Sequence, residues 1–382
     1  MSATDATFQN GDVVNGLDGT DRLNLTIADG NTPAGAEVNG VEQVFARNVS
    51  ESASEVSAAS ISGVEQLWNR NSIADSDVNF TSVGSNATLG VLNTGTNTEI
   101  GFTSTVLSGK DDTVNVALDQ AAGGNVTIGD GAETLSVNSG GSEANKLGTV
   151  DGGTAATLTL TGDQDLMIGG TDNSVETVDA SGFGGALTAT LSTAGTSNDV
   201  TVTGSAQDDS FTFGTLDEDD TIDGGDGEDT LSIVGDFDGV NLSNVENVNV
   251  KATSTTVTID ADKAQSVTEF AVDAAGFAVD TLEITNLAEG TSVTLNSNSD
   301  LTISGNNFSL DADEDGGGSD ALSLNFAGNG AFTINTTALT TNEVEEFNID
   351  VGQGGLTLNI ADALNLGSAT LEEVTFTGSG AS

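Results

Sequence analysis

The chain has 382 residues, 59 of them acidic and 7 basic, which gives a formal net charge of −52 at pH 7, and it contains no His, Cys or Tyr. This charge excludes nucleic acids and anionic membranes as partners, because both bind basic surfaces, and the apolar stretches are too short for membrane insertion. The absence of His and Cys excludes Ser-His-Asp and Cys-His catalysis and leaves oxygen ligands, which suit hard cations such as calcium.

The N-terminal region holds two acidic, glycine-containing turns between residues 10 and 23. Asp12 and Asp21 lie nine residues apart, and Asp18 lies between them. The glycines permit tight turns whose carbonyl groups face a cation, and the aspartates supply carboxylates. Asp12, Asp18 and Asp21 are therefore candidate calcium ligands. The short polar segment 2–9 is a candidate strand for joining one subunit to the next.

A Val-Glu pair followed by alternating apolar residues recurs along the chain. Its valines are Val41, Val64, Val175, Val245 and Val344. The gaps between successive copies are 23, 111, 70 and 99 residues, close to whole multiples of about 22 to 25. A repeat of that length is the size of one coil of a β-solenoid, in which each coil buries its apolar side chains against its neighbours. Alternatively, Val-Glu is a common pair in any β protein.

Trp68 is the only tryptophan of the chain, and Arg70 follows it closely. A single Trp most often packs onto a core, and we expect that arrangement here. An exposed Trp-Asn-Arg stretch could instead anchor an interface, because Trp and Arg are enriched at the centres of protein interfaces.

Short predicted strands occupy most of the sequence. Apolar and polar residues alternate over about five positions, β-branched residues are frequent, and Gly, Asn or Asp ends each run. Clear examples are residues 157–162, 199–204, 300–305 and 355–359. The predicted fold is all-β, a parallel β-solenoid. Its N-terminal segment would be 1–204 and its C-terminal segment 205–382, although the boundary is soft and the chain could form one continuous domain.

The densest acidic region, 208–229, holds ten carboxylates in 22 residues. From Gly224 the sequence fits the nonapeptide G-G-x-G-x-D-x-U-x, where U is a large apolar residue, so that Asp229 supplies a carboxylate and Leu231 enters the core. The candidate calcium ligands here are Asp208, Asp209, Asp217, Asp219, Asp220, Asp223, Gly225, Asp226, Gly227 and Asp229. Weaker copies elsewhere add Asp111, Asp112, Asp130, Glu133, Asp315, Gly317 and Asp320. Asp and Gly are also the usual residues of β-turns, so an ordinary solvated surface is the alternative.

These turns resemble the repeats-in-toxin family, most closely at residues 204–232. Together with the Val-Glu pairs and the Thr-rich and Asn-rich strands, the chain more specifically resembles the calcium-dependent surface-layer proteins of Gram-negative bacteria. The resemblance implies a right-handed parallel β-solenoid, ordering by several calcium ions and type I export without a cleaved N-terminal signal peptide. Long uninterrupted nonapeptide arrays are absent from this sequence, so its calcium sites should be few and dispersed.

We therefore expect a secreted, calcium-dependent structural protein that assembles with itself outside the cell, as a subunit of a surface layer or of an extracellular matrix filament. A cell-surface polysaccharide is a possible anchor. The alternative is a calcium-stiffened adhesin or ice-binding module that does not polymerise. We expect no enzyme activity, because no convergent set of catalytic residues is present.

Overall fold

The computed structural model describes the chain apart from residues 5–7, 29, 31–35, 193–198, 254–255, 274–280, 289, 297–300, 313–320, 328–331, 343–345, 353–355, 367–372 and 379–382. The described residues form a parallel β-solenoid of about 13 turns and contain no helix. The predicted all-β solenoid is thus confirmed, whereas its right-handedness stays a prediction. No described helix is long and apolar enough to cross a bilayer.

The chain divides into two compact units, each described separately below. The first contains Met1–Ala194 and Thr203–Gln207, and the second contains Gly195–Val202 and Asp208–Ser382. Strand β20 (Thr201–Thr203) includes residues of both units. Whether segments 1–204 and 205–382 are independent folding domains remains a prediction.

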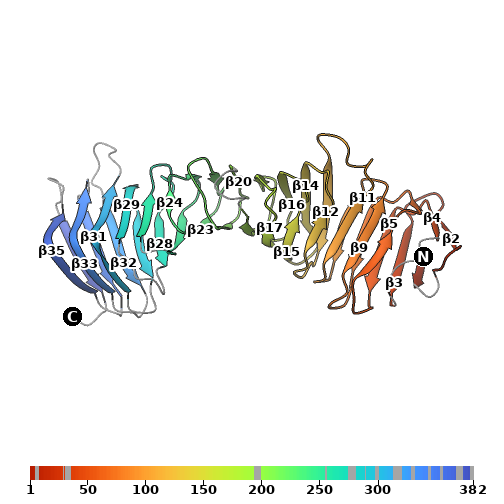
Figure 1. Ribbon diagram of the computed structural model, residues 1–382, viewed down its shortest axis with the longest axis horizontal. Coiled ribbons are helices and arrows are strands. Elements are labelled where there is room, and N and C mark those ends of the chain that lie inside the picture. The colour runs from red at the N-terminus through yellow and green to blue at the C-terminus, as the bar shows by residue number, and fades with distance from the viewer. Residues whose placement is uncertain are drawn as a thin grey trace. The chain divides into compact units, whose positions relative to one another are not determined.

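The first unit stacks its strands into two long parallel sheets and one short one (Figure 1). Sheet A contains β1 (Ser2–Thr4), β3 (Arg22–Ile27), β5 (Gln43–Asn48), β8 (Gln66–Arg70), β10 (Thr88–Leu92), β12 (Thr113–Asp119), β14 (Thr134–Gly140), β16 (Thr157–Gly162) and β18 (Thr177–Asp179). Sheet B contains β2 (Val13–Asn15), β4 (Glu37–Asn39) and β7 (Ile61–Ser62). Sheet C contains β6 (Ser54–Ser57), β9 (Val78–Val83), β11 (Thr98–Phe102), β13 (Val126–Ile128), β15 (Asn145–Asp151), β17 (Leu166–Thr171) and β19 (Leu187–Leu191).

The second unit is built in the same way. Sheet D contains β24 (Phe237–Asp238), β27 (Thr256–Asp260), β29 (Thr281–Leu287), β31 (Leu301–Ala312), β33 (Phe332–Asn342) and β35 (Leu356–Leu366). A second row of parallel strands in this unit contains β21 (Ser210–Phe213), β23 (Thr230–Val234), β26 (Asn247–Lys251), β28 (Glu269–Asp273), β30 (Ser292–Asn296), β32 (Ala321–Ala327), β34 (Glu346–Val351) and β36 (Glu373–Gly378). A further pair joins β22 (Thr221–Asp223) to β25 (Asn241–Ser243). Strands β31, β33 and β35 lie side by side near the C-terminal, blue end of the chain in Figure 1.

Consecutive coils place equivalent residues in contact, as the sequence repeat predicts. Gln43 of β5 pairs with Gln66 of β8, and their side-chain amides hydrogen-bond across a separation of 23 residues. The described valines of the Val-Glu pairs are all buried, and they are Val41, Val64, Val175 and Val245. The repeat length therefore corresponds to one coil, and the Val of each described pair points inward. Val344 lies outside the described residues.

The core consists of columns of apolar side chains that run along the solenoid. In β3 the buried side chains are Leu23, Leu25 and Ile27, at alternate positions, as the period of two requires. Phe residues make a large contribution to the second unit, where the rings of Phe237 and Phe270 meet edge to face at 5.6 Å between centroids.

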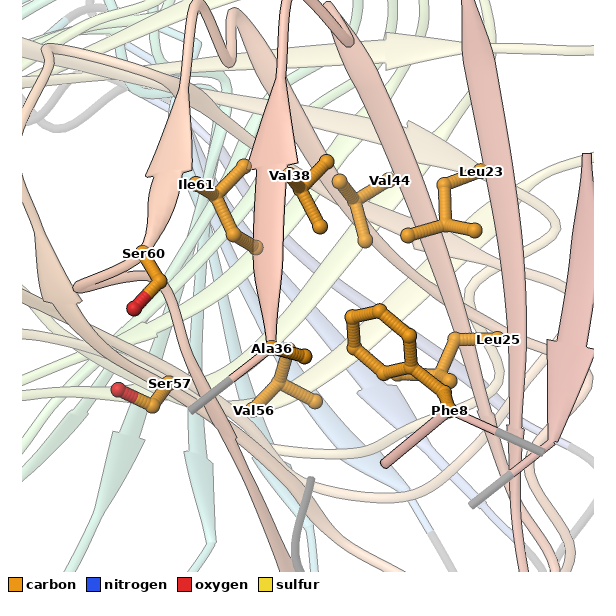
Figure 2. Close-up of a pocket in the computed structure, with 10 residues that line it drawn as sticks. All are labelled: Phe8, Leu23, Leu25, Ala36, Val38, Val44, Val56, Ser57, Ser60 and Ile61. Atoms are coloured by element: carbon orange, nitrogen blue, oxygen red, sulfur yellow. The ribbon is translucent and has the colours of Figure 1, made fainter. Parts of the chain in front are cut away.

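Phe8 closes the N-terminal end of the first unit. Its ring lies over the apolar side chains of the first coils, beside Leu25 and opposite Val56 (Figure 2). The cavity that remains there measures about 10 Å³, the space of roughly one water molecule, so it is a packing defect and not a ligand site. The ring of Phe8 is buried.

Candidate calcium-binding turns

The aspartates of the densest acidic region link successive coils of the second unit. Asp229 Oδ1 accepts a hydrogen bond from the backbone N–H of Asp209 at 2.7 Å. The backbone N–H of Asp229 in turn donates to Glu246 Oε2 at 2.8 Å. Because a strand's first N–H groups need acceptors once they are buried, each carboxylate completes the backbone pairing of the coil before it.

The same arrangement occurs twice in the first unit. The backbone N–H of Asp21 donates to Glu42 Oε2, and that of Asp112 donates to Glu133 Oε2, both at 2.7 Å. Within each turn the Asp carboxylate also accepts from a backbone N–H three or four residues earlier, at 2.9 Å from Leu17 to Asp21 and at 2.6 Å from Gly109 to Asp112. The structure therefore brings together the predicted ligands Asp112 and Glu133, through a backbone donor.

Asp220 is also enclosed by backbone donors. Its Oδ1 accepts from Val200 N at 2.8 Å, and its Oδ2 accepts from Asp217 N at 2.7 Å. Burial raises the pKa of the Asp220 carboxyl above its ordinary value, and the nearby charges of Asp217 and Asp199 raise it further, although the two hydrogen bonds act against this.

Asp229 stands apart from the other predicted ligands because one of its oxygens has no partner. The residue is fully buried, and its Oδ2 makes no hydrogen bond. This oxygen faces Gly224, where a Cβ atom would lie 2.5 Å from it and 1.9 Å from the carbonyl oxygen of Asn244. Glycine at 224 thus permits the close approach of a carboxylate oxygen and a backbone carbonyl, which are both calcium ligands by chemistry.

The charge around Asp229 is entirely negative. Burial, the largest cause, together with the charges of Asp209, Glu246 and Asp208, raises the pKa of its carboxyl from 3.8 to about 6, although the hydrogen bond from Asp209 N acts against this. A carboxyl in such surroundings gains stability from a proton or from a cation.

The remaining turn residues of this region are held by local hydrogen bonds or are exposed. Asp223 Oδ1 accepts from Asn244 Nδ2 at 2.7 Å, and Asp208 Oδ1 accepts from Glu228 N at 3.0 Å. Gly225 and Gly227 have φ angles of 101° and 132°, which side chains rarely tolerate, so the backbone requires glycine at both positions, while their role as calcium ligands stays a prediction. Asp217 is half-buried, whereas Asp219 and Asp226 are exposed.

The other predicted ligands are dispersed. Asp12 Oδ2 accepts from Gln9 N at 2.8 Å, whereas Asp18 and Asp111 are exposed. Asp130 lies close to Gly153 of the following coil, where a Cβ atom would be 3.1 Å from Asp130 Oδ1. The predicted ligands outside the described residues are Asp315, Gly317 and Asp320.

Sequence reasoning missed a column of aspartates that contains Asp130. The carboxyl of Asp151 shares a hydrogen bond with that of Asp172, and burial, this bond and the charges of Asp172 and Asp130 raise its pKa. These residues are about one coil apart in sequence, so only the stacking of coils brings them together. The signal that was available is their regular spacing of 21 residues, in 130, 151 and 172.

Comparison of the chain with protein-family models, with curated proteins and with solved structures finds no match. The resemblance to repeats-in-toxin and surface-layer proteins therefore stays a hypothesis, and the fold is argued from this chain alone.

The donor chemistry fits calcium only in part. Within the described portion of the chain, no three acidic side chains converge as a ready-made metal cage. Backbone N–H groups already occupy one or both carboxylate oxygens at Asp21, Asp112 and Asp220. The exception is Asp229 Oδ2, which is buried, unpartnered and beside a backbone carbonyl. Calcium binding by these turns remains a prediction, and Asp229 is the residue that favours it most.

Proposed function

We propose that this chain is a secreted structural protein that assembles with itself in the presence of calcium, as a repeating subunit of a bacterial surface layer or an extracellular matrix filament. The observation that carries the proposal is the buried, unpartnered oxygen of Asp229 among further carboxylates. A divalent cation at this point would satisfy the oxygen and offset the surrounding negative charge. Calcium is abundant outside cells, where modules of millimolar affinity operate.

The N-terminal end of the solenoid supports assembly. Strand β1 lies at the edge of sheet A, and an edge strand presents unpaired backbone groups to other chains. The same end exposes large apolar side chains, since Met1 is 61 %, Val13 55 % and Leu17 85 % exposed. An end that combines a strand edge with apolar side chains suits stacking against the end of another copy.

The predicted joining segment 2–9 is not a free arm, because parts of it pack against its own chain. Strand β1 pairs in parallel with β3, and the ring of Phe8 is buried in the first coils. Joining would therefore use the outer edge of β1 in place, with Phe8 keeping the end closed.

Electron microscopy and size-exclusion chromatography of the purified chain would test this function. The protein is compared in millimolar calcium, in the same concentration of magnesium, and after addition of a chelator. We expect ordered polymers in calcium that dissolve on chelation and do not form in magnesium. A protein that stays monomeric while calcium raises its melting temperature would favour the alternative, a calcium-stiffened adhesin or ice-binding module. If calcium changes neither the folding nor the assembly of the protein, both the proposed function and the alternative are refuted.

A further inference from the structure

All three arginines of this acidic chain, with its single tryptophan, lie on the outer face of sheet A in the first unit. We define the basic aromatic patch as Arg22 on β3, Phe45 and Arg47 on β5, and Trp68 and Arg70 on β8. Phe45 pairs with Trp68 in the register of the two strands. The patch therefore covers three successive coils.

The position of Trp68 corrects the expectation that it packs onto the core. In β8 the buried side chains are Leu67 and Asn69, and Trp68 between them points outward and is half-buried. Its indole stacks on Phe45 with ring centroids 5.5 Å apart and planes 2° from parallel, and its Nε1 donates to Gln66 Oε1 at 3.0 Å. A Cβ atom at Gly90 would lie 2.1 Å from the indole, so glycine there makes room for the ring.

Two of the arginines, Arg22 and Arg70, lie over this stack. The guanidinium carbon of Arg22 lies 3.5 Å from the centroid of the Phe45 ring, and that of Arg70 lies 5.7 Å from the same point. Both distances are within reach of a cation–π interaction, and they bring the two positive charges within about 9 Å of each other. The aromatic pair thus holds like charges together on one face.

None of the three arginines forms an ion pair with any described carboxylate. Arg22 Nε donates to the amide oxygen of Asn24, and Arg47 Nε donates to the carbonyl of Asn71, both at 3.0 Å. Arg70 Nε is buried and has no partner. Burial, and then the charge of Arg70, lower the pKa of Arg22. In the isolated chain the free energy at this patch is therefore raised by the burial and mutual repulsion of the guanidinium groups, and an incoming anion would offset this.

We propose that the basic aromatic patch binds a carboxylate-bearing face of a second copy of this chain. The patch has the composition of an interface centre, because Trp and Arg dominate such centres and a guanidinium binds a carboxylate through two parallel hydrogen bonds. Charge complementarity favours a second copy: of the 7 basic residues, only four lysines lie outside the patch, against 59 acidic residues. The self-assembly on which this inference rests is that of the proposed function.

The charge of the patch restricts the symmetry of the contact. A two-fold axis through the patch would bring arginine against arginine, so the partner surface must be a different, acidic face. A polymer further requires that this contact be heterologous, because a two-fold contact would stop at a dimer. Heterologous contacts that do not close into a ring grow into filaments or sheets, as a surface lattice requires.

Sedimentation velocity of the full-length chain tests the contact. The double variant Arg22→Gln, Arg70→Gln is compared with the wild type and with Lys146→Gln, which removes an exposed positive charge on β15 of the same unit. Across a concentration series in millimolar calcium at low salt, we expect the double variant to weaken self-association roughly tenfold or more and Lys146→Gln to leave it unchanged. Association that is equal in all three proteins would overturn the proposal.

A cross-linking experiment keeps the inference testable if the double variant misfolds. Arg70→Lys keeps the positive charge and places an amine in the patch, which a zero-length carbodiimide couples to a carboxylate in contact with it. A mixture of ¹⁴N-labelled and ¹⁵N-labelled chains distinguishes links between copies from links within one copy. We expect mixed-isotope links from position 70 to acidic residues. Links from position 70 confined to its own chain would contradict the proposal.

Three further outcomes distinguish the contact at the patch from polysaccharide binding and from calcium-dependent assembly. A polyuronate that shifts the fluorescence of Trp68, at concentrations where added protein copies do not, would assign the patch to an acidic polysaccharide and overturn the proposal. Calcium-dependent polymers that form equally well from the double variant would leave the proposed function intact and refute the patch. Conversely, association that is lost in the double variant but indifferent to calcium would support the patch and refute the calcium-dependent function.

Discussion

At the scale of single residues, the acidic turns first supply hydrogen bonds between coils, in which a backbone N–H donates to a carboxylate. Asp21, Asp112 and Asp229 each have a backbone N–H bonded to a Glu of the next coil, and Asp229 in addition accepts from Asp209. The D-x-U pattern therefore has a structural reason that holds without any metal. A metal role is an addition, and it is best supported where an oxygen remains free, at Asp229 Oδ2.

Replacing the Asp229 carboxylate with the amide of asparagine separates the two roles. The amide oxygen can still accept the hydrogen bond from Asp209 N, but the buried negative charge is gone. For Asp229→Asn in chelator at pH 7.5, we therefore expect the free energy of unfolding to rise by about 1 kcal/mol. Stabilisation by calcium should be lost in the same variant. Urea unfolding with and without calcium measures both effects.

Asp262→Asn is the matched control, because Asp262 is exposed and belongs to the same unit. It should change neither quantity by more than about 0.5 kcal/mol. If calcium stabilises Asp229→Asn as strongly as the wild type, Asp229 is not a calcium ligand, and its role is that of a hydrogen-bond acceptor alone.

Gly90 shows how one missing side chain shapes a surface. A methyl group at this position would overlap the indole of Trp68, so Gly90→Ala should displace the ring from Phe45 and cost roughly 1–3 kcal/mol of stability. Because Trp68 is the only tryptophan, its emission reports the change directly, and we expect a red shift. An unchanged emission spectrum together with unchanged stability would show that the ring does not lie over Gly90.

At the scale of the element, the Val-Glu pair is the corner of a coil. Val245 is buried, and Glu246 accepts the backbone N–H of Asp229 from the preceding coil. Val41 and Glu42 do the same for Asp21. In these two copies one residue packs inward while the next completes the backbone pairing, which explains why the spacing of the pair predicts the coil length.

Strand positions followed from alternation wherever the inward residues were apolar. Residues 157–162 form β16 as predicted, and the described residues of 300–305 and 355–359, which are 301–305 and 356–359, fall at the starts of the longer strands β31 and β35. The orientation of Trp68 was not predictable in this way because Asn69 occupies an inward position. Its buried amide donates hydrogen bonds to the hydroxyls of Thr96 and Thr98, which belong to the next coil.

The acidic site was less predictable than the strands. Which carboxylate keeps a free oxygen depends on the hydrogen-bond donors that the stacking of coils brings to it. The local sequences around Asp229 and Asp220 are similar, so they do not reveal which of the two this is. Asp220 has both oxygens bonded to backbone N–H groups, whereas Asp229 has one. The contact between Asp151 and Asp172 likewise arises from the pairing of coils.

Phe8 provides a test of how the N-terminal end is closed. Its ring is buried over the first coils, so Phe8→Ala would open the core to water and should cost roughly 3 kcal/mol of unfolding free energy. We expect hydrogen exchange to accelerate mainly in β1, β3 and β5, because each coil of a solenoid contacts only its neighbours. Exchange that accelerates uniformly through both units would show that the chain unfolds as one cooperative body.

At the scale of the whole molecule, the charge of −52 destabilises the folded state in two ways, through exposed carboxylates and through buried ones. Exposed carboxylates repel one another through solvent, and salt screens this repulsion. Buried carboxyls such as Asp229, Asp220 and Asp151 carry raised pKa values, whose largest cause in each is burial, and salt screens them much less. A bound divalent cation would relieve both contributions at once.

The pH dependence of stability follows from these raised pKa values. The pKa of Asp229 is about 6 in the folded chain against an ordinary 3.8, so between these values the folded chain holds a proton that the unfolded chain has lost. Folding is therefore favoured at low pH, and the advantage disappears as the pH rises through about 6. In chelator we expect the free energy of unfolding to fall by about 1–2 kcal/mol between pH 4.5 and 7.5, less than the whole shift implies because solvent screens part of it.

Urea unfolding midpoints are measured at pH 4.5 and 7.5, each without salt and with about 0.5 M salt to screen the exposed charges. They divide the fall in the free energy of unfolding into the contributions of exposed and of buried carboxylates. Salt should remove the share that arises from exposed carboxylates and leave the share of the buried ones. Calcium should remove the share of Asp229 in the wild type and remove nothing in Asp229→Asn, whose remaining fall arises from Asp220 and Asp151. A midpoint that rises with pH in chelator would contradict the raised pKa of Asp229, and with it the reason for expecting a cation there.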